Sequence, residues 1–235
     1  MNSFETIYLK ETESTNTYAK ALLKSGEPCA PFTLIYAENQ TKGRGRLGRN
    51  WESKKGDTLC MSLIVPYPNN PAITLLSALG VHKALTKLTD ADIKIKWPND
   101  LITENKKLCG ILTESTDKYA VIGIGINLNT EVFSEEIVHK ATSLKLVTGK
   151  RFIPEEIAEI VAEEVIAVLQ ESGGNLSEEI IRQYTKLCAN IGRQIVFGEN
   201  IGIATGISLD GCLEVLRNNA TEYIRSGEVT ISGIY

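Results

Sequence analysis

The chain has 235 residues, of which 43% are hydrophobic and 23% are charged, with a formal net charge of −4 and a pI near 5.4. This composition indicates a globular protein with a sizeable core, and the acidic balance excludes a general nucleic-acid coat. The hydrophobic runs are much shorter than the roughly 20 residues of a membrane span, and residues 1–10 lack the features of a signal peptide. Five scattered cysteines without a CxxC pair indicate reduced thiols, and two histidines do not predict a zinc site. We therefore expect a cytoplasmic protein that does not associate with membranes.

The first half of the chain predicts strands interleaved with helices. Ser14 to Thr17 offer N-cap residues for a helix that Gly26 would end, and Pro71 opens a long amphipathic helix that runs to about Leu88. Alternating or continuous apolar runs predict strands at 4–10, 32–37, 58–65 and 93–97, and a hairpin formed by 108–114 and 119–128.

The second half changes character after Asn190. Helices are predicted first, at 141–146, 154–170 and 176–187. Short β-type runs separated by turn residues follow, at 193–198, 201–208, 212–217, 221–225 and 228–232. Five short strands in about 45 residues predict a small SH3-like barrel appended to an α+β domain. We therefore expect two domains, an α+β domain at 1–188 and a barrel at 189–235.

The most unusual stretch is residues 40–51, Gln-Thr-Lys-Gly-Arg-Gly-Arg-Leu-Gly-Arg-Asn-Trp. Between Thr41 and Lys55 six Lys or Arg residues accompany one Glu, and glycines occupy positions 43, 45 and 48. Glycine raises the entropy of the open chain and the cations repel one another, so an anion is expected to order this segment. We interpret it as a mobile loop whose N–H and guanidinium groups wrap phosphate, with a solvated surface loop as the alternative.

The same glycines match a dinucleotide-binding fingerprint, Gly43-x-Gly45-x-x-Gly48. A strand precedes them, but residues 50–56 lack the period of an amphipathic helix, so the pyrophosphate would have no helix N-terminus to bind. The Gly-Lys-Ser/Thr of a Walker loop is missing too. The dinucleotide-binding and Walker-loop interpretations are therefore rejected, and a loop of another kind that binds phosphate stays possible.

A second set of polar residues follows the strand at 93–97, in Lys96-Trp-Pro-Asn-Asp100. A lysine at a strand end could serve as a point charge for a carboxylate or an α-phosphate oxygen, although an ordinary turn with Asn and Asp is an equal alternative. Lys107 could extend this positive rim. Asn127, which closes the Gly-Ile-Gly-Ile-Asn run, could contact a base or a metal, or could simply end a strand.

Taken together, these segments resemble the biotin protein ligase family, in order and spacing and over nearly the whole chain. The motifs that carry the resemblance are Ser14-Thr-Asn16, Gln40 with Gly43-Arg-Gly-Arg-Leu-Gly-Arg49, Lys96-Trp-Pro-Asn-Asp100, Lys107-Leu-Cys-Gly-Ile-Leu112 and Gly123-Ile-Gly-Ile-Asn127. The resemblance implies a mixed sheet flanked by helices, as in class II synthetase-like catalytic domains, with the small barrel at the C-terminal end. Cys109 and Leu47 depart from the usual pattern without changing a proposed ligand.

The resemblance also implies an activity, namely joining biotin to AMP from ATP, with Mg²⁺, and then to a lysine of a biotin carboxyl carrier protein or domain. Lys96 and Arg46 would be catalytic. The residues implied in biotin binding are Ser14, Thr15, Asn16, Gln40, Gly43, Arg44 and Lys96. Those implied in nucleotide binding are Arg46, Arg49, Trp51, Asn99, Asp100, Lys107 and Asn127, with Asp100 as a candidate Mg²⁺ ligand. Because only 13 residues precede Ser14, we expect no helix-turn-helix and no DNA binding, and either a monomer or a homodimer.

Two rival functions can be compared with this one. A lipoate–protein ligase or lipoyl/octanoyl transferase shares the fold, but the transferases use a nucleophilic cysteine, and none of the cysteines here lies in an activated setting. A nucleic-acid-binding module would need a basic barrel with exposed aromatics. Residues 190–235 instead contain three basic residues against five acidic ones, which argues against it.

Overall fold

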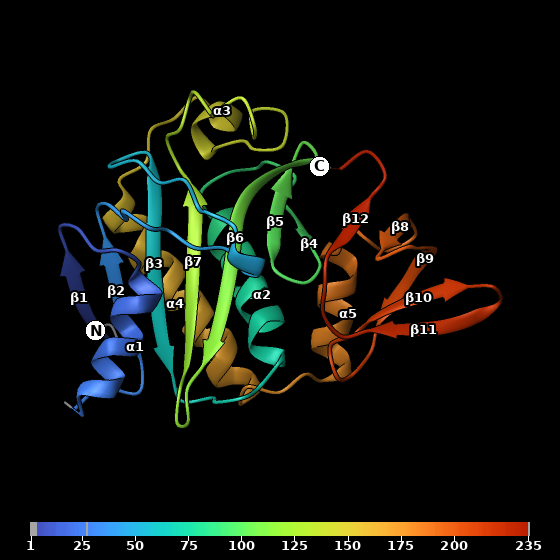
Figure 1. Ribbon diagram of the computed structural model, residues 1–235, viewed down its shortest axis with the longest axis horizontal. Coiled ribbons are helices and arrows are strands. Elements are labelled where there is room, and N and C mark those ends of the chain that lie inside the picture. Colours follow the sequence, from blue (N-terminus) through green and yellow to red (C-terminus); the bar gives the residue numbers. More distant parts are fainter. Residues whose placement is uncertain (1–3, 27, 235) are drawn as a thin grey trace.

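The computed structural model describes residues 4–26 and 28–234, which form two sheets with helices packed on the larger one (Figure 1). The larger sheet contains β1 (Glu5–Leu9), β2 (Thr33–Ala37), β3 (Thr58–Val65), β4 (Lys94–Lys96), β5 (Asp100–Thr103), β6 (Lys106–Ser115) and β7 (Ala120–Asn127). The strand order is β1-β2-β3-β7-β6-β5-β4, with β1 parallel to β2 and the other neighbours antiparallel. The predicted mixed sheet is thus confirmed.

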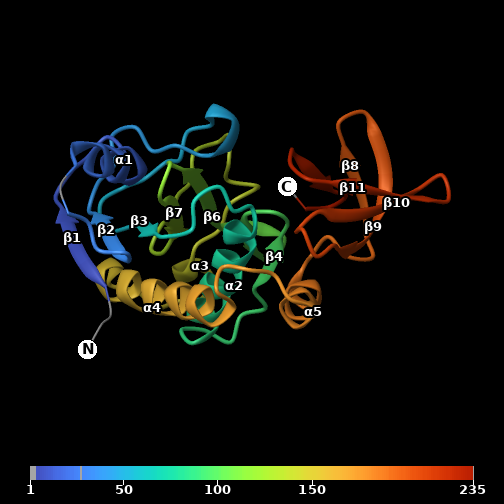
Figure 2. The same cartoon turned by 90° about the horizontal axis from the view of Figure 1, so that it is seen from below.

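Helices cover both faces of this sheet. Those on its faces are α1 (Thr15–Ser25), α2 (Ala72–Thr86) and α4 (Pro154–Ser172), while α3 (Leu144–Thr148) and α5 (Glu178–Leu187) lie at its periphery. Figure 2 shows α2 and α4 side by side along one face of the sheet and α1 on the other. Because side chains alternate along a strand, β7 sends Ile122 and Ile124 into the α2–α4 core and Val121 into the smaller core under α1. The following positions on the α1 side are Gly123 and Gly125, so this face is left open for other groups.

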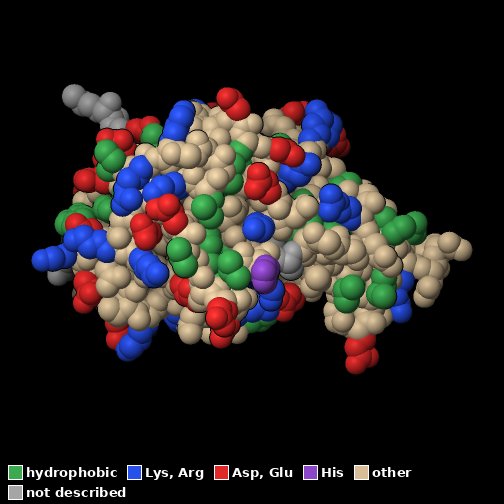
Figure 3. Space-filling view, turned by 90° about the horizontal axis from the view of Figure 1, so that it is seen from above, with side chains coloured by type: hydrophobic (Ala, Val, Ile, Leu, Met, Phe, Trp, Pro, Cys, Tyr) green, Lys and Arg blue, Asp and Glu red, His purple; other side chains and the backbone are tan. Residues whose placement is uncertain are grey.

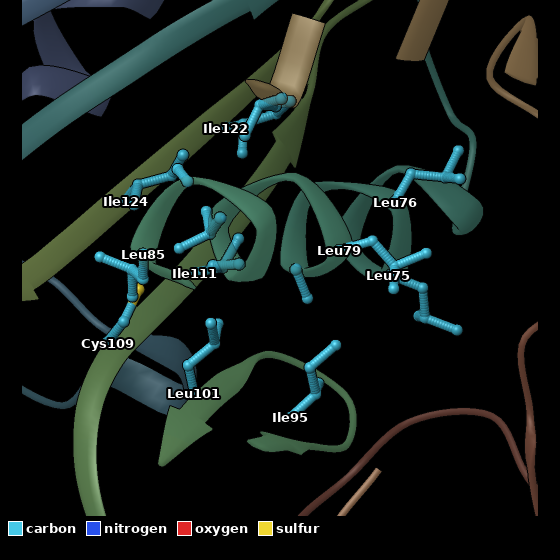
Figure 4. Packing of buried hydrophobic residues seen from close by; sticks show 14 of the residues in the cluster. Leu75, Leu76, Leu79, Leu85, Ile95, Leu101, Cys109, Ile111, Ile122 and Ile124 are labelled. Atoms are coloured by element: carbon cyan, nitrogen blue, oxygen red, sulfur yellow. The ribbon is translucent and has the colours of Figure 1, made fainter. Parts of the chain in front are cut away.

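The main core lies between the sheet and the α2–α4 pair. Figure 4 shows leucines of α2, among them Leu76, Leu79 and Leu85, in the same packed cluster as Ile111 and Ile122 of the sheet. Close packing of the two helices depends on Gly80, because a Cβ there would lie 2.6 Å from the Cα of Val165 in α4. The cleft described below is therefore built on a tightly packed support.

The second sheet is antiparallel and consists of five short strands. They are β8 (Gln194–Phe197), β9 (Asn200–Ile207), β10 (Leu213–Arg217), β11 (Ala220–Ile224) and β12 (Val229–Ile231), in the order β11-β10-β9-β8-β12. This arrangement agrees with the small SH3-like barrel expected from the sequence. The buried indole N–H of Trp97 donates to the Gly211 carbonyl at 3.1 Å, and residues of both sheets share one hydrophobic cluster. The division at residue 188 stays a prediction.

Two local features differ from the sequence-based expectations. Residues 100–103 form strand β5, which was not predicted. Of the turn with Asn and Asp that was one alternative, Asn99 lies in the turn at 97–99, whereas Asp100 already pairs with Lys96 across two strands. Helix α3 begins later than expected, because the Ser143 hydroxyl caps it by accepting from the Leu146 N–H. Within residues 4–26 and 28–234, no helix has the length and apolar character needed to cross a membrane.

Candidate functional site

A cleft of about 970 Å³ opens on the α1 side of the larger sheet, where the ends of β6 and β7 meet the glycine/arginine loop 40–51. The turn between β4 and β5 and the barrel residues 227–230 complete its walls. The sequence-predicted residues that line it are Ser14, Thr15, Asn16, Gln40, Arg44, Arg46, Arg49, Trp51, Lys96, Asn99, Asp100, Lys107 and Asn127. The structure therefore brings together residues that lie up to 113 positions apart in the sequence. Gly43 is not among the lining residues.

The floor of the cleft is made by glycines of the two central strands. A Cβ on Gly125 would lie 2.4 Å from the Trp51 ring, and one on Gly110 would lie 3.1 Å from it. The Nζ atom of Lys107 lies 5.6 Å from the centroid of the same ring, a cation–π contact. Trp51 can therefore lie flat against the sheet only because the strands carry no side chains at these positions.

Polar groups gather at the N-terminus of α1. The Gln40 side-chain oxygen accepts from the Thr15 backbone N–H at 2.8 Å and from the Thr15 hydroxyl at 3.1 Å. The buried Ser62 hydroxyl lies 2.7 Å from the Thr15 hydroxyl and 2.6 Å from the Asn16 side-chain oxygen. These groups form a preorganised set of hydrogen-bond donors and acceptors at one end of the cleft, suited to a small polar head group. Ser14, also buried, begins the helix without a side-chain cap bond.

Glu114 connects this polar set to the loop, a role that was not predicted from the sequence. Its carboxylate accepts from the Asn16 amide at 2.8 Å and forms ion pairs with Lys20 at 2.5 Å and Arg44 at 3.5 Å. Burial would raise the pKa of Glu114, but the hydrogen bonds from Lys20 and Asn16 and the charges of Lys20 and Arg44 outweigh burial, so the pKa lies below its usual value. Ser62 was missed as well. A polar residue inside the otherwise apolar run 58–65 was the signal available for it.

The glycine/arginine loop is more regular than expected. It folds back on itself through hydrogen bonds from Trp51 N to Gly43 O at 3.0 Å and from Gly45 N to Arg49 O at 2.7 Å, with a short 3₁₀ turn over Arg46–Gly48 at its tip. A Cβ on Gly43 would lie 2.5 Å from the Trp51 carbonyl oxygen. The first glycine of the motif therefore lets the two sides of the loop meet. A contact between Gly43 and biotin remains a prediction.

Lys96 and Asp100 lie directly opposite each other across the β4–β5 pair. Both are buried, with exposed fractions of 8% for Lys96 and 9% for Asp100. An oxygen of Asp100 lies 2.7 Å from the Nζ atom of Lys107. Burial lowers the pKa of Lys96 below its usual value, and the charges of Lys107 and Arg49 act in the same direction. The carboxylates of Asp100 and Glu228 oppose this shift. A buried ammonium whose charge is poorly solvated is stabilised when an anion binds beside it.

The loop arginines point to acceptors on two different walls. Arg46 donates to the Asn99 side-chain oxygen at 2.7 Å and to the Gly227 carbonyl at 3.0 Å. Asn99 is held in turn, because its amide donates to the Ile111 carbonyl at 2.9 Å. Arg49 forms an ion pair with Glu228 of the barrel. These barrel contacts were not foreseen from the sequence, since about 180 residues separate the partners.

Asn127 is tied to the segment that follows β7. Its side-chain amide donates to the Thr142 carbonyl at 3.0 Å, which connects the strand end to the residues before α3. This contact supports the strand-ending alternative, and contacts of Asn127 with a nucleotide or a metal remain predictions.

The cleft therefore combines a polar end at α1 with a cationic end at Lys96, Arg46 and Arg49. Preorganised cations in a partly water-excluded site stabilise anions and the negative charge that develops in acyl and phosphoryl transfer. On the face seen from above in Figure 3, basic and acidic side chains are interspersed. The positive charge of the cleft is thus a local feature of an acidic protein.

Comparison with known proteins identifies the family to which this fold is similar. The model of the biotin/lipoate A/B protein ligase family matches residues 8–129. Biotin protein ligase from Aquifex aeolicus, solved in complex with biotin and ATP, superposes with a TM-score of 0.86 at 31% identity, covering 97% of this chain and 98% of that one. Biotin–[acetyl-CoA-carboxylase] ligase of Paracoccus denitrificans is 29% identical over 243 residues, covering 96% of this chain and all of the relative.

The match to the bifunctional ligase/repressor BirA of Bacillus spizizenii is 37% identical over 156 residues, or 62% of this chain. It spans 47%, about half, of that relative's length. The family model covers more than half of the chain, and the Aquifex structure is 31% identical over nearly all of it. The chain therefore belongs to the biotin protein ligases of the biotin/lipoate A/B protein ligase family.

Proposed function

We propose that this protein is an ATP-dependent biotin–protein ligase, which converts biotin and ATP to biotinyl-5′-AMP and then transfers biotin to a lysine of a biotin carboxyl carrier protein or domain. The observation that carries the proposal is the cleft itself. It joins the buried Lys96 and the loop arginines to the polar set at α1 in one continuous space. Such a space can hold a polar head group at one end and a phosphate at the other.

In the first step the biotin carboxylate attacks the α-phosphorus of ATP, an acyl–phosphate bond forms, and pyrophosphate leaves. Two anions must approach each other for this reaction. Lys96 and Arg46 offset their repulsion and stabilise the charge that develops on the phosphate oxygens. Arg49 adds a third cation at the same end, and Asn99 orients Arg46 through the 2.7 Å hydrogen bond.

The residues at the α1 end bind the head group of biotin. Ser14, Thr15 and Gln40 offer hydrogen bonds, and Asn16 is oriented by Ser62 and Glu114. Arg44 lies beside this set through its ion pair with Glu114. Trp51 supplies an apolar face between the two ends of the cleft, and Lys107 and Asp100 lie beside the nucleotide.

Mg²⁺ accompanies ATP in this proposal. The few carboxylates of the cleft fit an ion that is coordinated mainly by the phosphates of ATP. Among residues 4–26 and 28–234, no group of three His, Cys, Asp or Glu side chains could hold a metal. Asp100 is the candidate protein ligand, although its carboxylate also pairs with Lys107. Mg²⁺ is commonly bound through one or two carboxylates together with substrate phosphates and waters. When bound, it would neutralise charge on the phosphate oxygens.

In the second step the amine of the acceptor lysine attacks the acyl carbon of biotinyl-AMP, a new amide bond forms, and AMP leaves with the phosphate. The mixed anhydride hydrolyses readily, so the glycine/arginine loop protects it by excluding water until the acceptor arrives. We place the enzyme in the cytoplasm, where ATP is available and where its five cysteines, all unpaired, stay reduced. The acceptor would enter over the open side of the cleft.

Calorimetry with biotin and with lipoate, each with and without ATP, tests the choice of substrate. We expect biotin to bind and lipoate to bind at least tenfold more weakly, because a site with placed polar partners strongly rejects an acid that lacks the matching groups. The family model covers both kinds of ligase, so this comparison is decisive. Tight binding of lipoate without binding of biotin would replace the proposal with a lipoate ligase.

The polar end of the cleft can be tested at Gly123, where a Cβ would lie 2.4 Å from the Asn16 side-chain oxygen. Gly123→Ala should weaken biotin binding roughly 5- to 100-fold, the range expected for overpacking a close contact. Gly45→Ala is the matched control, because Gly45 lines the same cleft and its Cβ would have a neighbour no closer than 3.6 Å. Equal biotin affinities in the two variants, measured by calorimetry, would remove the α1 end as the head-group site.

A further inference from the structure

The C-terminal barrel supplies an anion to a cleft that is otherwise built to bind anions. The connection between β11 and β12 places Gly227 and Glu228 in the cleft wall. Gly227 accepts from Arg46 at 3.0 Å, and Glu228 forms an ion pair with Arg49. The tip of the glycine/arginine loop is therefore attached to the barrel at two neighbouring residues.

Glu228 interacts electrostatically with the whole cationic end of the cleft. The hydrogen bond from Arg49 is the main reason that the pKa of Glu228 lies below its usual value, and the charges of Lys96 and Arg46 contribute to the same shift. The carboxylate thus partly neutralises the positive potential that a phosphate group in the cleft would experience. A site for an anionic substrate gains no affinity from a fixed carboxylate, so the position of Glu228 calls for another explanation.

The ion pair has the properties of a reversible contact. The side chain of Arg49 is 63% exposed and that of Glu228 is 54% exposed. Exposed ion pairs of this kind change an equilibrium only roughly two- to fivefold, and salt screens them. A phosphate group carries more charge than a carboxylate and can accept bidentate hydrogen bonds from an arginine, so it competes effectively for Arg49.

We propose that Glu228 is a built-in counter-anion for Arg49, which holds the loop when the cleft contains no phosphate and releases Arg49 when a phosphate group enters. This inference rests on the proposed function only in requiring that the cleft bind phosphate. Glu228 is a positioning residue in this scheme and acts through Arg49. The contact of Arg46 with the Gly227 carbonyl does not depend on the Glu228 side chain, so it can persist after the release.

The scheme makes two predictions that a purely structural role would not make together. We call the state with the Arg49–Glu228 ion pair latched and the state without it unlatched. Replacing Glu228 by Gln destabilises the latched state relative to both the unlatched state and the phosphate-bound state. The loop should therefore become less protected without phosphate, and phosphate should nevertheless bind more tightly. A carboxylate that only supported the binding-competent geometry would make the loop less protected and the binding weaker.

The experiment uses the full chain and inorganic pyrophosphate as the probe. Hydrogen exchange of the amides at 41–55 is measured without ligand, and pyrophosphate binding is measured by calorimetry at low and at moderate salt. For Glu228→Gln we expect exchange roughly two- to fivefold faster, and binding tighter by a similar factor at low salt. The gap in affinity should shrink as salt rises.

Glu222→Gln is the matched control, because it removes the same charge from the barrel. Glu222 pairs with Arg217 at 3.0 Å and does not line the cleft. Both measurements should be unchanged in this variant. Unchanged or weaker pyrophosphate binding in Glu228→Gln, or no pyrophosphate binding in the unmodified protein, would overturn the inference. If the expected pattern is found but biotin-dependent pyrophosphate release is not, the latch stands and the proposed function falls.

Discussion

Lys96→Ala is expected to reduce biotin-dependent release of pyrophosphate by about 10²- to 10³-fold, which is the typical cost of removing one group that stabilises transition-state charge. The fold should remain intact, because burial already disfavours the ammonium and the substitution removes that unfavourable group. Pyrophosphate release is measured with and without biotin, and the melting temperature is measured in parallel. The loss of activity should therefore come without a loss of stability.

Lys94→Ala provides the control for this prediction. Lys94 lies two residues earlier on the same strand, is exposed, and pairs with Asp92 rather than with a residue of the cleft. Its removal should leave pyrophosphate release within about twofold of the unmodified protein, as is usual for surface positions. Wild-type release from Lys96→Ala would remove this lysine from the mechanism.

Gly80→Ala is expected to destabilise the protein through a single added methyl group. The new Cβ would lie 2.6 Å from the Cα and 2.9 Å from the backbone N of Val165. Because these are backbone atoms of α4, relief requires the two helices to move apart. Overpacking of this kind costs about 1–3 kcal/mol, which exceeds the up to ~1 kcal/mol that alanine gains over glycine in a helix.

The free energy of unfolding is measured with denaturant, and the melting temperature should fall by roughly 2–4 °C for each kcal/mol lost. Lys83→Ala places alanine at an exposed position of the same helix and should change stability by less than about 0.5 kcal/mol. A Gly80→Ala protein as stable as the unmodified chain would mean that the α2–α4 contact is not tight.

Much of the secondary structure could be predicted from local patterns. The strands at 58–65 and 119–128 and the helix opened by Pro154 follow from apolar periodicity and helix-start residues, and each lies close to its expected position. Strand β5 could not be predicted in the same way. It has only four residues and becomes a strand by pairing with β4 and β6, which are partners that periodicity does not specify.

The residues of the site likewise differ in whether local patterns could predict them. The resemblance in motifs identified most of the residues that line the cleft, because those motifs carry unusual local composition. Glu114 and Glu228 were missed because each looks ordinary in its own stretch, and Ser62 was missed although it interrupts an apolar run. They become important only through contacts with residues far away in the chain.

Through its motifs, the sequence alone determined the family and the mixed sheet that the resemblance implies, and it predicted the C-terminal barrel. It also predicted that the cationic loop and Lys96 act together, and that role stays a prediction. Composition, motif spacing and periodicity are local properties of the chain, so they can be recognised without a three-dimensional structure. Only the tertiary structure showed that the loop closes on itself at Gly43 and Trp51, and that the barrel supplies an acceptor and an anion to its tip. A contact between Arg49 and Glu228 spans 179 residues, and no local pattern specifies a pair so distant.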